Sequence, residues 1–273
     1  MALRFDLGPF DELHIGKCVI KNSRERERAI FAVNGEAPIL RGKDVLSPAL
    51  AVTALEKLYC CVQRMYLEEA HEELQESYLA LAGSLKEDPS LYAELHAADQ
   101  LISNRKYYQA LKGLKRLIRE EAFVVHRSPP DQYGPRYDLG PFDELHVGKC
   151  VITNSHERTL FVVNGEVPIL NGKDALSSAL AVSALEKLYC CVQRMYLEEV
   201  HEELQGSYLA LAAGSLKEDP SLYAELHAAD QLISNRKYYQ ALKGLKGLIG
   251  EDAFVVHRNP SDRYVPRYGG RKL

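Results

Sequence analysis

The chain has 273 residues, of which 46% are hydrophobic and 26% charged, and its formal net charge is -4. These proportions are typical of an ordinary soluble globular protein and exclude the disordered and fibrous classes. No run approaches the roughly 18 consecutive apolar residues of a membrane-spanning helix, and the first residues lack the apolar core of a signal peptide. We therefore expect a cytoplasmic protein that does not associate with a membrane.

The chain consists of two similar copies. Residues 6–14 recur as 138–146, residues 83–115 recur unchanged as 214–246, and the copies agree at roughly 85% of aligned positions. A copy of this size can bury a single core, so we expect each copy to fold as its own unit. Alternatively, the copies pack through like surfaces as an intramolecular pseudo-dimer. The predicted segments are copy 1 (1–127), a Pro/Gly-rich linker (128–136), copy 2 (137–258) and a flexible tail (259–273).

The first part of each copy predicts a small antiparallel sheet. In copy 1, short runs rich in Ile, Val, Phe and Cys predict strands over 13–20, 29–33 and 37–40. Asn34 and Gly35 predict a tight hairpin turn between the last two strands, and Pro38 places the third strand at an edge of the sheet.

A helical pattern follows the strands. Ser47 as N-cap and Pro48 at the first helical position predict that the longest helix covers 48–67. Three more helices are predicted, over 69–81, from Asp88 onward and from about residue 106. The predicted fold class is therefore α+β, in which each of two tandem repeats has an N-terminal antiparallel sheet and a C-terminal helical bundle.

Basic residues of the predicted hairpin form a candidate phosphate-binding surface. If residues 22–29 are extended, Arg24, Arg26 and Arg28 share one face. An equally supported interpretation is a solvated hairpin tip whose arginines and glutamates offset each other. The basic character is stronger in copy 1, because Arg41 becomes Asn171 and Arg116 becomes Gly247. The candidate RNA-binding residues are Arg24, Arg26, Arg28, Arg41, Lys43, Arg158 and Lys173.

One face of the predicted long helix carries aromatic and amide side chains. Tyr59, Gln63 and Tyr66 have the spacing i, i+4 and i+7, which suits either a helix packing seam or a binding face. The binding interpretation takes the face for a partner protein or for RNA bases. The candidate partner-binding residues are Tyr59, Gln63 and Tyr66 in copy 1 and Tyr189, Gln193 and Tyr196 in copy 2.

The sequence carries no recognisable catalytic or metal-binding pattern. The histidines at 14, 71, 96 and 126 lack ligand spacing, the six cysteines contain no Cys-x-x-Cys pair, and neither a nucleophile elbow nor a P-loop occurs. We therefore expect no metal, no cofactor and no enzymatic activity, with the cysteines reduced and mostly buried.

Several strings, in their order and spacing, resemble the flagellar biosynthesis repressor FlbT family. In copy 1 they are residues 15–22, an Arg-rich hairpin, 38–46, 59–67 and 107–112, so the resemblance covers nearly all of each copy except the Pro-rich tails. The chain departs from the family pattern in having two tandem copies and in Gly42 and Gly172, where a second charged residue is usual. The family motif carries over to Arg41, Lys43, Asp44, Tyr59, Gln63, Met65 and Tyr66, and to Lys173, Asp174, Tyr189, Gln193, Met195 and Tyr196.

The resemblance implies a cytoplasmic post-transcriptional regulator of flagellin synthesis, without catalysis of its own. Such a protein binds the 5' untranslated leader of flagellin messenger RNA and promotes degradation of the messenger. The leading hypothesis is therefore an RNA-binding repressor whose basic residues contact phosphates. The rival hypothesis is an adaptor of flagellar assembly that binds flagellin or another flagellar regulator through its helical bundle.

Overall fold

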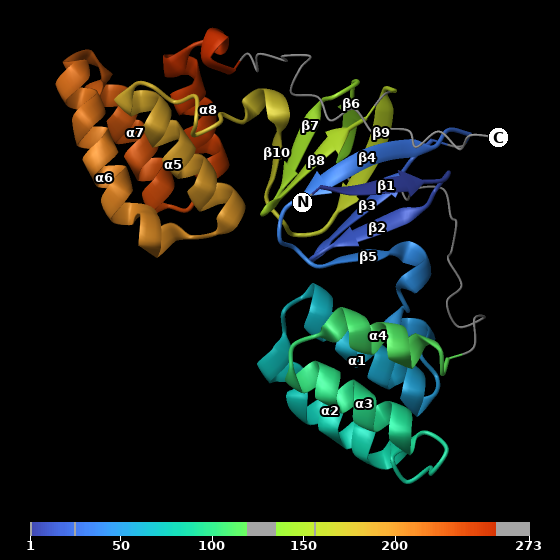
Figure 1. The fold of residues 1–273 in the computed structure, drawn as a ribbon. Helices are drawn as coiled ribbons and strands as arrows, with labels where there is room; N and C mark the ends of the chain where they lie inside the picture. The colour runs from blue at the N-terminus through green and yellow to red at the C-terminus, as the bar shows by residue number, and fades with distance from the viewer. Residues whose placement is uncertain (1, 25, 119–134, 156, 255–273) are drawn as a thin grey trace, which may run out of the picture. The chain divides into compact units, whose positions relative to one another are not determined.

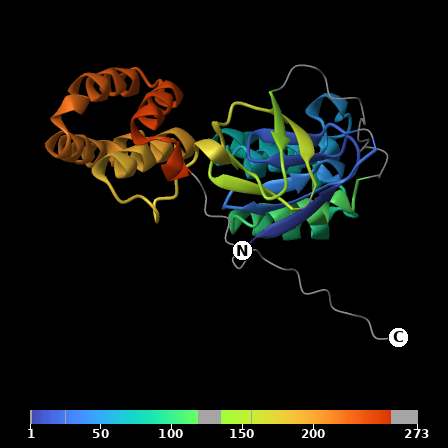
Figure 2. The ribbon, with the colours of Figure 1, turned by 90° about the horizontal axis from the view of Figure 1, so that it is seen from above.

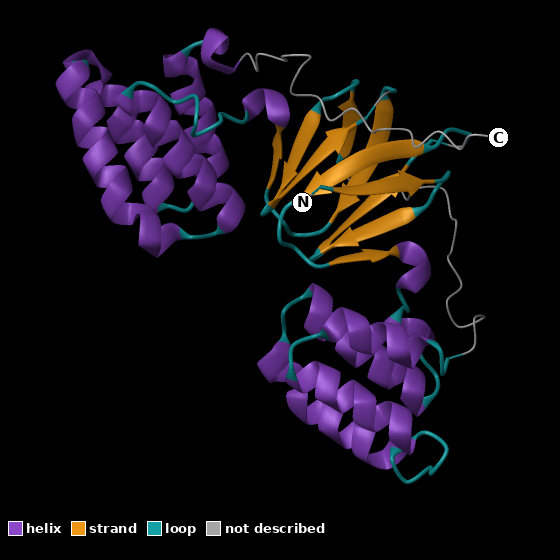
Figure 3. Cartoon of the chain, viewed as in Figure 1, coloured by secondary structure: helices purple, strands orange, loops and turns teal. Residues whose placement is uncertain are grey.

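The computed structural model describes residues 2–24, 26–118, 135–155 and 157–254. The chain divides into two compact units, residues 1–169 and 170–273. The predicted linker lies outside the described residues except for residues 135 and 136, and the predicted tail, Arg119 and His126 lie outside them entirely. In each copy the strands come first and the α-helices follow, which confirms the predicted α+β class (Figure 3).

The described strands form two five-stranded antiparallel sheets. The first sheet has the order β1-β4-β8-β7-β10, and the second has the order β5-β2-β3-β9-β6. Copy 1 contributes β1 (Leu3–Leu7), β2 (Glu12–Ile15), β3 (Cys18–Asn22), β4 (Ala29–Asn34) and β5 (Ile39–Arg41). Copy 2 contributes β6 (Arg136–Leu139), β7 (Glu144–Val147), β8 (Cys150–Asn154), β9 (Thr159–Asn164) and β10 (Ile169–Asn171), and the boundary between the units passes through β10.

Both copies contribute strands to both sheets. β3 of copy 1 pairs with β9 of copy 2, and β4 of copy 1 pairs with β8 of copy 2. In Figures 1 and 2 the blue strands of copy 1 and the green to yellow strands of copy 2 lie in the same sheets. The expectation that each copy folds as its own unit is therefore wrong for the strands, because each copy supplies only part of either sheet.

The strands themselves differ from the predicted ones at three places. β1 was not predicted, and the predicted strand 13–20 is two strands, separated by a turn in which Gly16 has a φ of +54°. The turn at Asn34 and Gly35 does not close a hairpin, since β4 pairs with β1 and β8 while β5 pairs with β2. The chain changes sheets at this turn. The predicted edge position of the strand after Pro38 is confirmed, because β5 is the outermost strand of its sheet.

The core between the sheets is shared by the two copies. Phe31 and Phe161 are fully buried at its centre, with ring centroids 5.2 Å apart and an interplanar angle of 83°. The same cluster includes Leu13 and Ile20 of copy 1 and Ile152 of copy 2, all with no exposed surface. Burial of this apolar surface from both copies is the main force that holds the strands of the two copies together.

Helices follow the strands of copy 1. They are α1 (Ala54–Leu67), α2 (His71–Leu85), α3 (Tyr92–Ser103) and α4 (Tyr107–Lys115). The predicted helix start at Ser47 is wrong, because Ser47 makes no capping hydrogen bond and Pro48–Leu50 forms a short 3-10 turn. Thr53 is the true N-cap of α1: its hydroxyl accepts a hydrogen bond from the Glu56 backbone N–H, and the Glu56 carboxylate accepts one from the Thr53 N–H.

The second unit contains the helices of copy 2. They are α5 (Ala184–Glu198), α6 (His201–Glu218), α7 (Tyr223–Ser234) and α8 (Tyr238–Ile249). Ser183 and Glu186 repeat the capping box at the start of α5. The helices enclose their own core, which includes Leu188, Tyr189, Ala241 and Leu245. None of the described helices in either unit combines the length and apolarity that crossing a membrane requires.

Candidate nucleic-acid interface

The segment between β3 and β4, predicted as an Arg-rich hairpin, instead connects the two sheets, because β3 pairs with β2 and β9 while β4 pairs with β1 and β8. Two of the three arginines of this β3–β4 connection form ion pairs within the chain. Arg24 pairs with Glu27, and the Arg28 Nε donates a hydrogen bond of 2.8 Å to the Asp6 Oδ1 of β1. This hydrogen bond and the nearby carboxylate charge raise the pKa of Arg28. Arg28 and Asp6 are exposed, so water and salt screen the pair. These pairs favour the interpretation in which the charges of this segment offset each other.

Arg158 of copy 2 is held in the same way. Its Nε donates to Asp138 Oδ1 at 2.8 Å, and the hydrogen bond from Arg158 holds the pKa of the Asp138 carboxyl below its usual range. A phosphate would therefore have to compete with a carboxylate for this guanidinium.

Three candidate residues of copy 1 remain exposed without a carboxylate partner among the described residues: Arg26, Arg41 and Lys43. The guanidinium of Arg41 lies over the Phe5 ring, 5.8 Å from its centroid. Lys173, the equivalent of Lys43 in copy 2, is likewise exposed. These side chains are free to contact an anion.

The sheet topology places Arg41 and the start of the β3–β4 connection at one end of the second sheet. Leu13 of β2 lies opposite both Arg41 of β5 and Ile20 of β3, and β3 ends two residues later, at Asn22, where the β3–β4 connection begins. Neighbouring strands of a sheet lie about 4.8 Å apart, so β5 and β3 lie at that distance on either side of β2. The predicted basic residues of copy 1 are thus brought to the same end of the sheet.

A further group of residues adjoins Lys43 where α4 meets the segment after β5. The Lys115 Nζ donates to the Lys43 carbonyl oxygen at 2.8 Å and lies 2.7 Å from the Asp44 Oδ1. The Lys112 Nζ lies 4.8 Å from the centroid of the exposed Tyr108 ring. The Tyr108 ring is 6.1 Å from that of Tyr66. We call this group the basic-aromatic junction; it consists of Lys43, Tyr66, Tyr108, Lys112 and Lys115.

Copy 2 repeats the junction with similar distances. The Lys246 Nζ donates to the Lys173 carbonyl oxygen at 2.9 Å, and the Lys243 Nζ lies 4.8 Å from the Tyr239 ring centroid. The rings of Tyr196 and Tyr239 are 5.9 Å apart. The arrangement is therefore a property of the repeat. Sequence reasoning did not select Tyr108 and Lys112 as site residues, although their i, i+4 spacing on the polar side of the last helix was a usable signal.

Tyr59 and Gln63 do not form an exposed binding face, which corrects that prediction. Tyr59 is 1% exposed and Gln63 5% exposed. The Tyr59 hydroxyl donates to the Asp44 carbonyl oxygen at 2.6 Å, and burial raises the pKa of Tyr59. The Gln63 amide donates to the Leu46 carbonyl oxygen and accepts from the Leu46 N–H. These side chains pack the segment 44–46 against α1.

The equivalent residues of copy 2 have the same role. The Tyr189 hydroxyl donates to the Asp174 carbonyl oxygen at 2.5 Å, and Gln193 accepts from the Leu176 N–H at 2.8 Å. Tyr189 is 1% exposed. Of the predicted face, Tyr66, Tyr196 and Gln193 remain partly accessible. The Tyr66 hydroxyl accepts a hydrogen bond from the Ile39 N–H at 3.2 Å, which ties the junction to β5.

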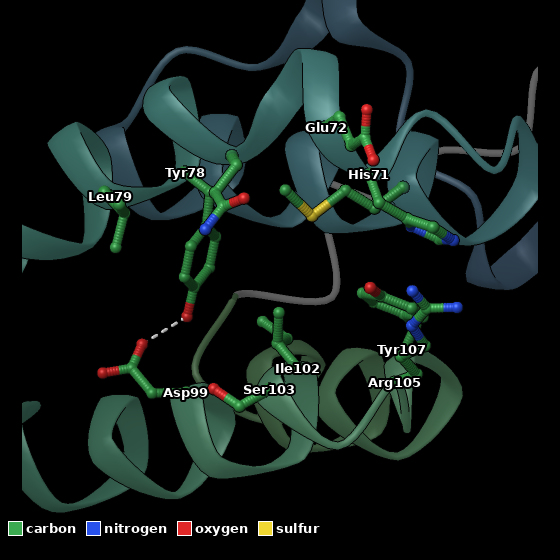
Figure 4. Close-up of a pocket in the computed structure, with 11 residues that line it drawn as sticks. His71, Glu72, Tyr78, Leu79, Asp99, Ile102, Ser103, Arg105 and Tyr107 are labelled. Atoms are coloured by element: carbon green, nitrogen blue, oxygen red, sulfur yellow. Dashed lines mark hydrogen bonds between the residues drawn. The ribbon is translucent and has the colours of Figure 1, made fainter.

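A pocket of about 470 Å³ lies between α2, α3 and the start of α4 (Figure 4). At one end the His71 and Tyr107 rings are stacked, with centroids 4.6 Å apart, and the His71 Nδ1 is buried with no hydrogen-bond partner among the residues that the structure describes. At the other end the Tyr78 hydroxyl donates to Asp99 at 2.5 Å. His201 and Tyr238 repeat the stacked pair in copy 2. Nowhere in the described parts of the chain do three or more potential ligands gather as a metal site would require.

Comparisons with known proteins cover nearly all of both copies. The family model described as "Flagellar protein FlbT" matches residues 3–125 and again residues 136–255. A protein of Rhodopseudomonas palustris, named probable flagellum biosynthesis repressor protein FlbT, is 38% identical over 128 residues, which are 46% of this chain and all of that protein. The flagellum biosynthesis repressor protein FlbT of Caulobacter vibrioides is 28% identical over 44% of this chain and 87% of its own length. No solved structure matches the chain.

Proposed function

Because the chain belongs to the FlbT family, in two tandem copies, we propose that it represses flagellum biosynthesis by binding the 5' untranslated leader of flagellin messenger RNA in the cytoplasm and promoting degradation of that messenger. The names of its relatives support the repressor role. Binding of the messenger leader is the part of the proposal that goes beyond those names. The protein itself performs no chemistry in this proposal: bound leader is cut by the nucleases of the cell.

The observation that carries RNA binding is the basic-aromatic junction, present in both copies. Lysine ammonium groups neutralise phosphates, and exposed aromatic rings stack on unpaired bases, so the two side-chain types together suit single-stranded RNA. Lys112 over Tyr108 provides both within 4.8 Å. Arg41 and Arg26 extend the positive charge toward the end of the second sheet in copy 1.

Copy 1 is the stronger binder in this proposal. Asn171 replaces Arg41 and Gly247 replaces Arg116, so copy 2 retains the junction but loses two flanking cations. Each lost phosphate contact reduces both the affinity and its dependence on salt.

The test is binding of the purified chain to a flagellin-messenger leader and to a shuffled leader across a salt series. The double variant K43A/K112A should weaken leader binding at least about tenfold and flatten the salt dependence by roughly 0.7 per lost contact. K57A, which removes an exposed lysine of α1 outside the junction, is the matched control. Equal binding of both RNAs, or an unchanged slope in K43A/K112A, would overturn the proposed site.

A second candidate function is favoured by exposed apolar side chains that recur in the helices of both copies. Leu79 of α2 is 59% exposed and Tyr92 of α3 is 55% exposed, and their equivalents Leu209 and Tyr223 are 56% and 65% exposed. Such residues suit a protein partner. In this alternative the chain is an adaptor that binds flagellin or another flagellar regulator.

The two candidates are separated by a capture experiment with nuclease. A flagellin-related protein that stays bound after nuclease treatment, and is lost in L79E/L209E, supports the adaptor. Loss of every partner upon nuclease treatment supports the RNA-binding repressor.

A further inference from the structure

The pairing between copies is made twice, in the same way. Val19 of β3 lies opposite Asn164 of β9, and Val151 of β8 lies opposite Asn34 of β4. Val151 is the equivalent of Val19 and Asn164 is the equivalent of Asn34. The two strand ladders therefore obey a local two-fold relationship, which is the signature of an isologous interface.

The hydrogen bonds that extend the two ladders follow the same rule. The Ser23 N–H donates to the Leu160 carbonyl oxygen at 3.2 Å, and the Ser155 N–H donates to the Ile30 carbonyl oxygen at 3.0 Å. Ser155 is the equivalent of Ser23, and Leu160 of Ile30. Each copy therefore donates a hydrogen bond to the other copy, and accepts one from it, at equivalent positions.

The paired strands are also close to interchangeable in sequence. β3 reads Cys-Val-Ile-Lys-Asn and β8 reads Cys-Val-Ile-Thr-Asn, while β4 and β9 share the central Phe and the final Val-Asn. If β3 paired with β4 of another copy 1 in the same register, Lys21 would lie opposite Ala32 instead of Val162. That change removes methyl groups and introduces no clash.

The turns at Gly35 and Gly165 pack closely against the backbone of the other copy. A Cβ atom added at Gly35 would lie 2.5 Å from the Lys149 carbonyl oxygen, and one added at Gly165 would lie 2.6 Å from the Lys17 carbonyl oxygen. Both glycines have φ angles near +140° (+143° and +137°). Each repeat therefore carries a turn glycine whose closest neighbours belong to the other repeat.

One repeat alone is incomplete. It would supply two strands to one sheet and three to the other, with β3 and β4 as open edges, and Phe31 would keep its contact with Phe5 but lose the one with Phe161. Open apolar edges are unstable and pair with another chain when they can. The Rhodopseudomonas palustris relative, matched over its whole length by less than half of this chain, contains one repeat.

We propose that the surface formed by β3, β4 and the Gly35 turn is a homotypic pairing surface whose partner is a second copy of the same repeat. The tandem chain is then a covalently joined form of a repeat dimer. The connection between the copies is dispensable for their association, and either copy is able to occupy either side of the interface.

The first test cuts the connection in the full chain. Residues 128–134 are replaced by a protease recognition sequence, and the purified protein is cleaved and weighed by size exclusion with light scattering and by native mass spectrometry. The halves should remain together at the mass of the intact chain, 30.7 kDa. Separation of the halves at micromolar concentration, whether folded or unfolded, would overturn the proposal.

The second test exchanges the copies. A full-length chain with copy 1 in both positions, and another with copy 2 in both, should each be monomeric and unfold cooperatively like the natural chain. Aggregation or loss of cooperative unfolding in these chains shows that the surface is specific for the mixed pair, which contradicts homotypic pairing.

The turn glycine provides the matched variant. In the cleaved protein, Gly35→Ala should raise the dissociation constant of the halves at least tenfold, because the added Cβ meets the backbone of the other copy. Gly113→Ala is the control, since a Cβ there meets no atom within 4 Å. Equal effects of the two substitutions would remove the turn from the proposed surface.

Discussion

The Phe31 ring contacts the Phe161 ring edge-to-face at equivalent positions of the two copies, with centroids 5.2 Å apart. Each ring fills the space beside the other between the two sheets, and both are fully buried. This contact joins the two copies and is one that neither copy makes within itself.

This contact predicts that truncation of either ring destabilises the first unit strongly and to the same extent. Phe31→Ala and Phe161→Ala should each lower the free energy of unfolding of the first unit by about 3 to 5 kcal/mol, because each leaves a cavity at the same place. The double variant should cost less than the sum, since the second substitution removes a ring that has already lost its contact with the other copy. Chemical denaturation measures all three. Leu79→Ala, at an exposed position, is the control, and strict additivity would contradict the shared cavity.

Gln63 should matter for stability and not for recognition. Its amide makes two hydrogen bonds to the backbone of Leu46, at 2.8 and 3.1 Å, and is buried. Gln63→Leu leaves the buried Leu46 N–H without its acceptor and leaves the Leu46 carbonyl oxygen only the weak hydrogen bond from the Cys60 thiol, so we expect a loss of about 1 to 3 kcal/mol in the free energy of unfolding. Binding of RNA or of a partner by the folded fraction should be unchanged. A binding defect without a stability defect would restore the original prediction of a recognition face.

Helices were predictable from sequence because their apolar periodicity is local. The start of α1 was misplaced because two capping signals compete: Ser47 with Pro48, and Thr53 with Glu56. Only the second is completed by reciprocal hydrogen bonds, and the choice between them depends on how residues 44–46 pack against Tyr59.

Strand pairing could not be predicted in the same way. β3 and β8 have nearly the same sequence, so no local pattern says whether β4 pairs with β3 or β8. The arginines between β3 and β4 show the same limit. Asp6, the partner of Arg28, lies on a strand that was not predicted, so charge patterning within 22–29 alone could not show that Arg28 is paired.

His146 makes the first unit sensitive to acid. Burial lowers the pKa of His146 below its ordinary value of 6.5, so the unfolded chain binds the proton more readily than the folded chain. The histidine's contribution to stability is therefore complete above pH 6.5 and is lost as the pH falls toward the lowered value. Urea denaturation between pH 5 and 8 should show this fall, and His146→Gln should reduce it. An identical pH profile in the variant would contradict the assignment.

The rate at which the cysteine thiols are alkylated should report opening of the core. All six cysteines are buried, and burial raises the pKa of Cys18 to about 12. The reactive thiolate is therefore scarce at pH 8 in the folded protein. We expect alkylation of Cys18 to follow the rate of unfolding, measured by mass spectrometry of digested protein in increasing urea. Rapid labelling in the absence of urea would show that the turn between β2 and β3 opens locally.

The weaker RNA-binding role proposed for copy 2 predicts a gain of function. Asn171→Arg and Gly247→Arg restore the cations that copy 1 has at these positions, and a side chain at Gly247 meets no atom within 4 Å of its Cβ. The double variant should bind the leader more tightly at low salt, and the slope of log affinity against log salt should steepen by roughly 0.7 for each new phosphate contact. Gly206→Arg, at an equally open position of α6, adds a charge outside the junction and serves as control. If this control strengthens binding as much as the double variant does, bulk charge explains the affinity and the junction does not.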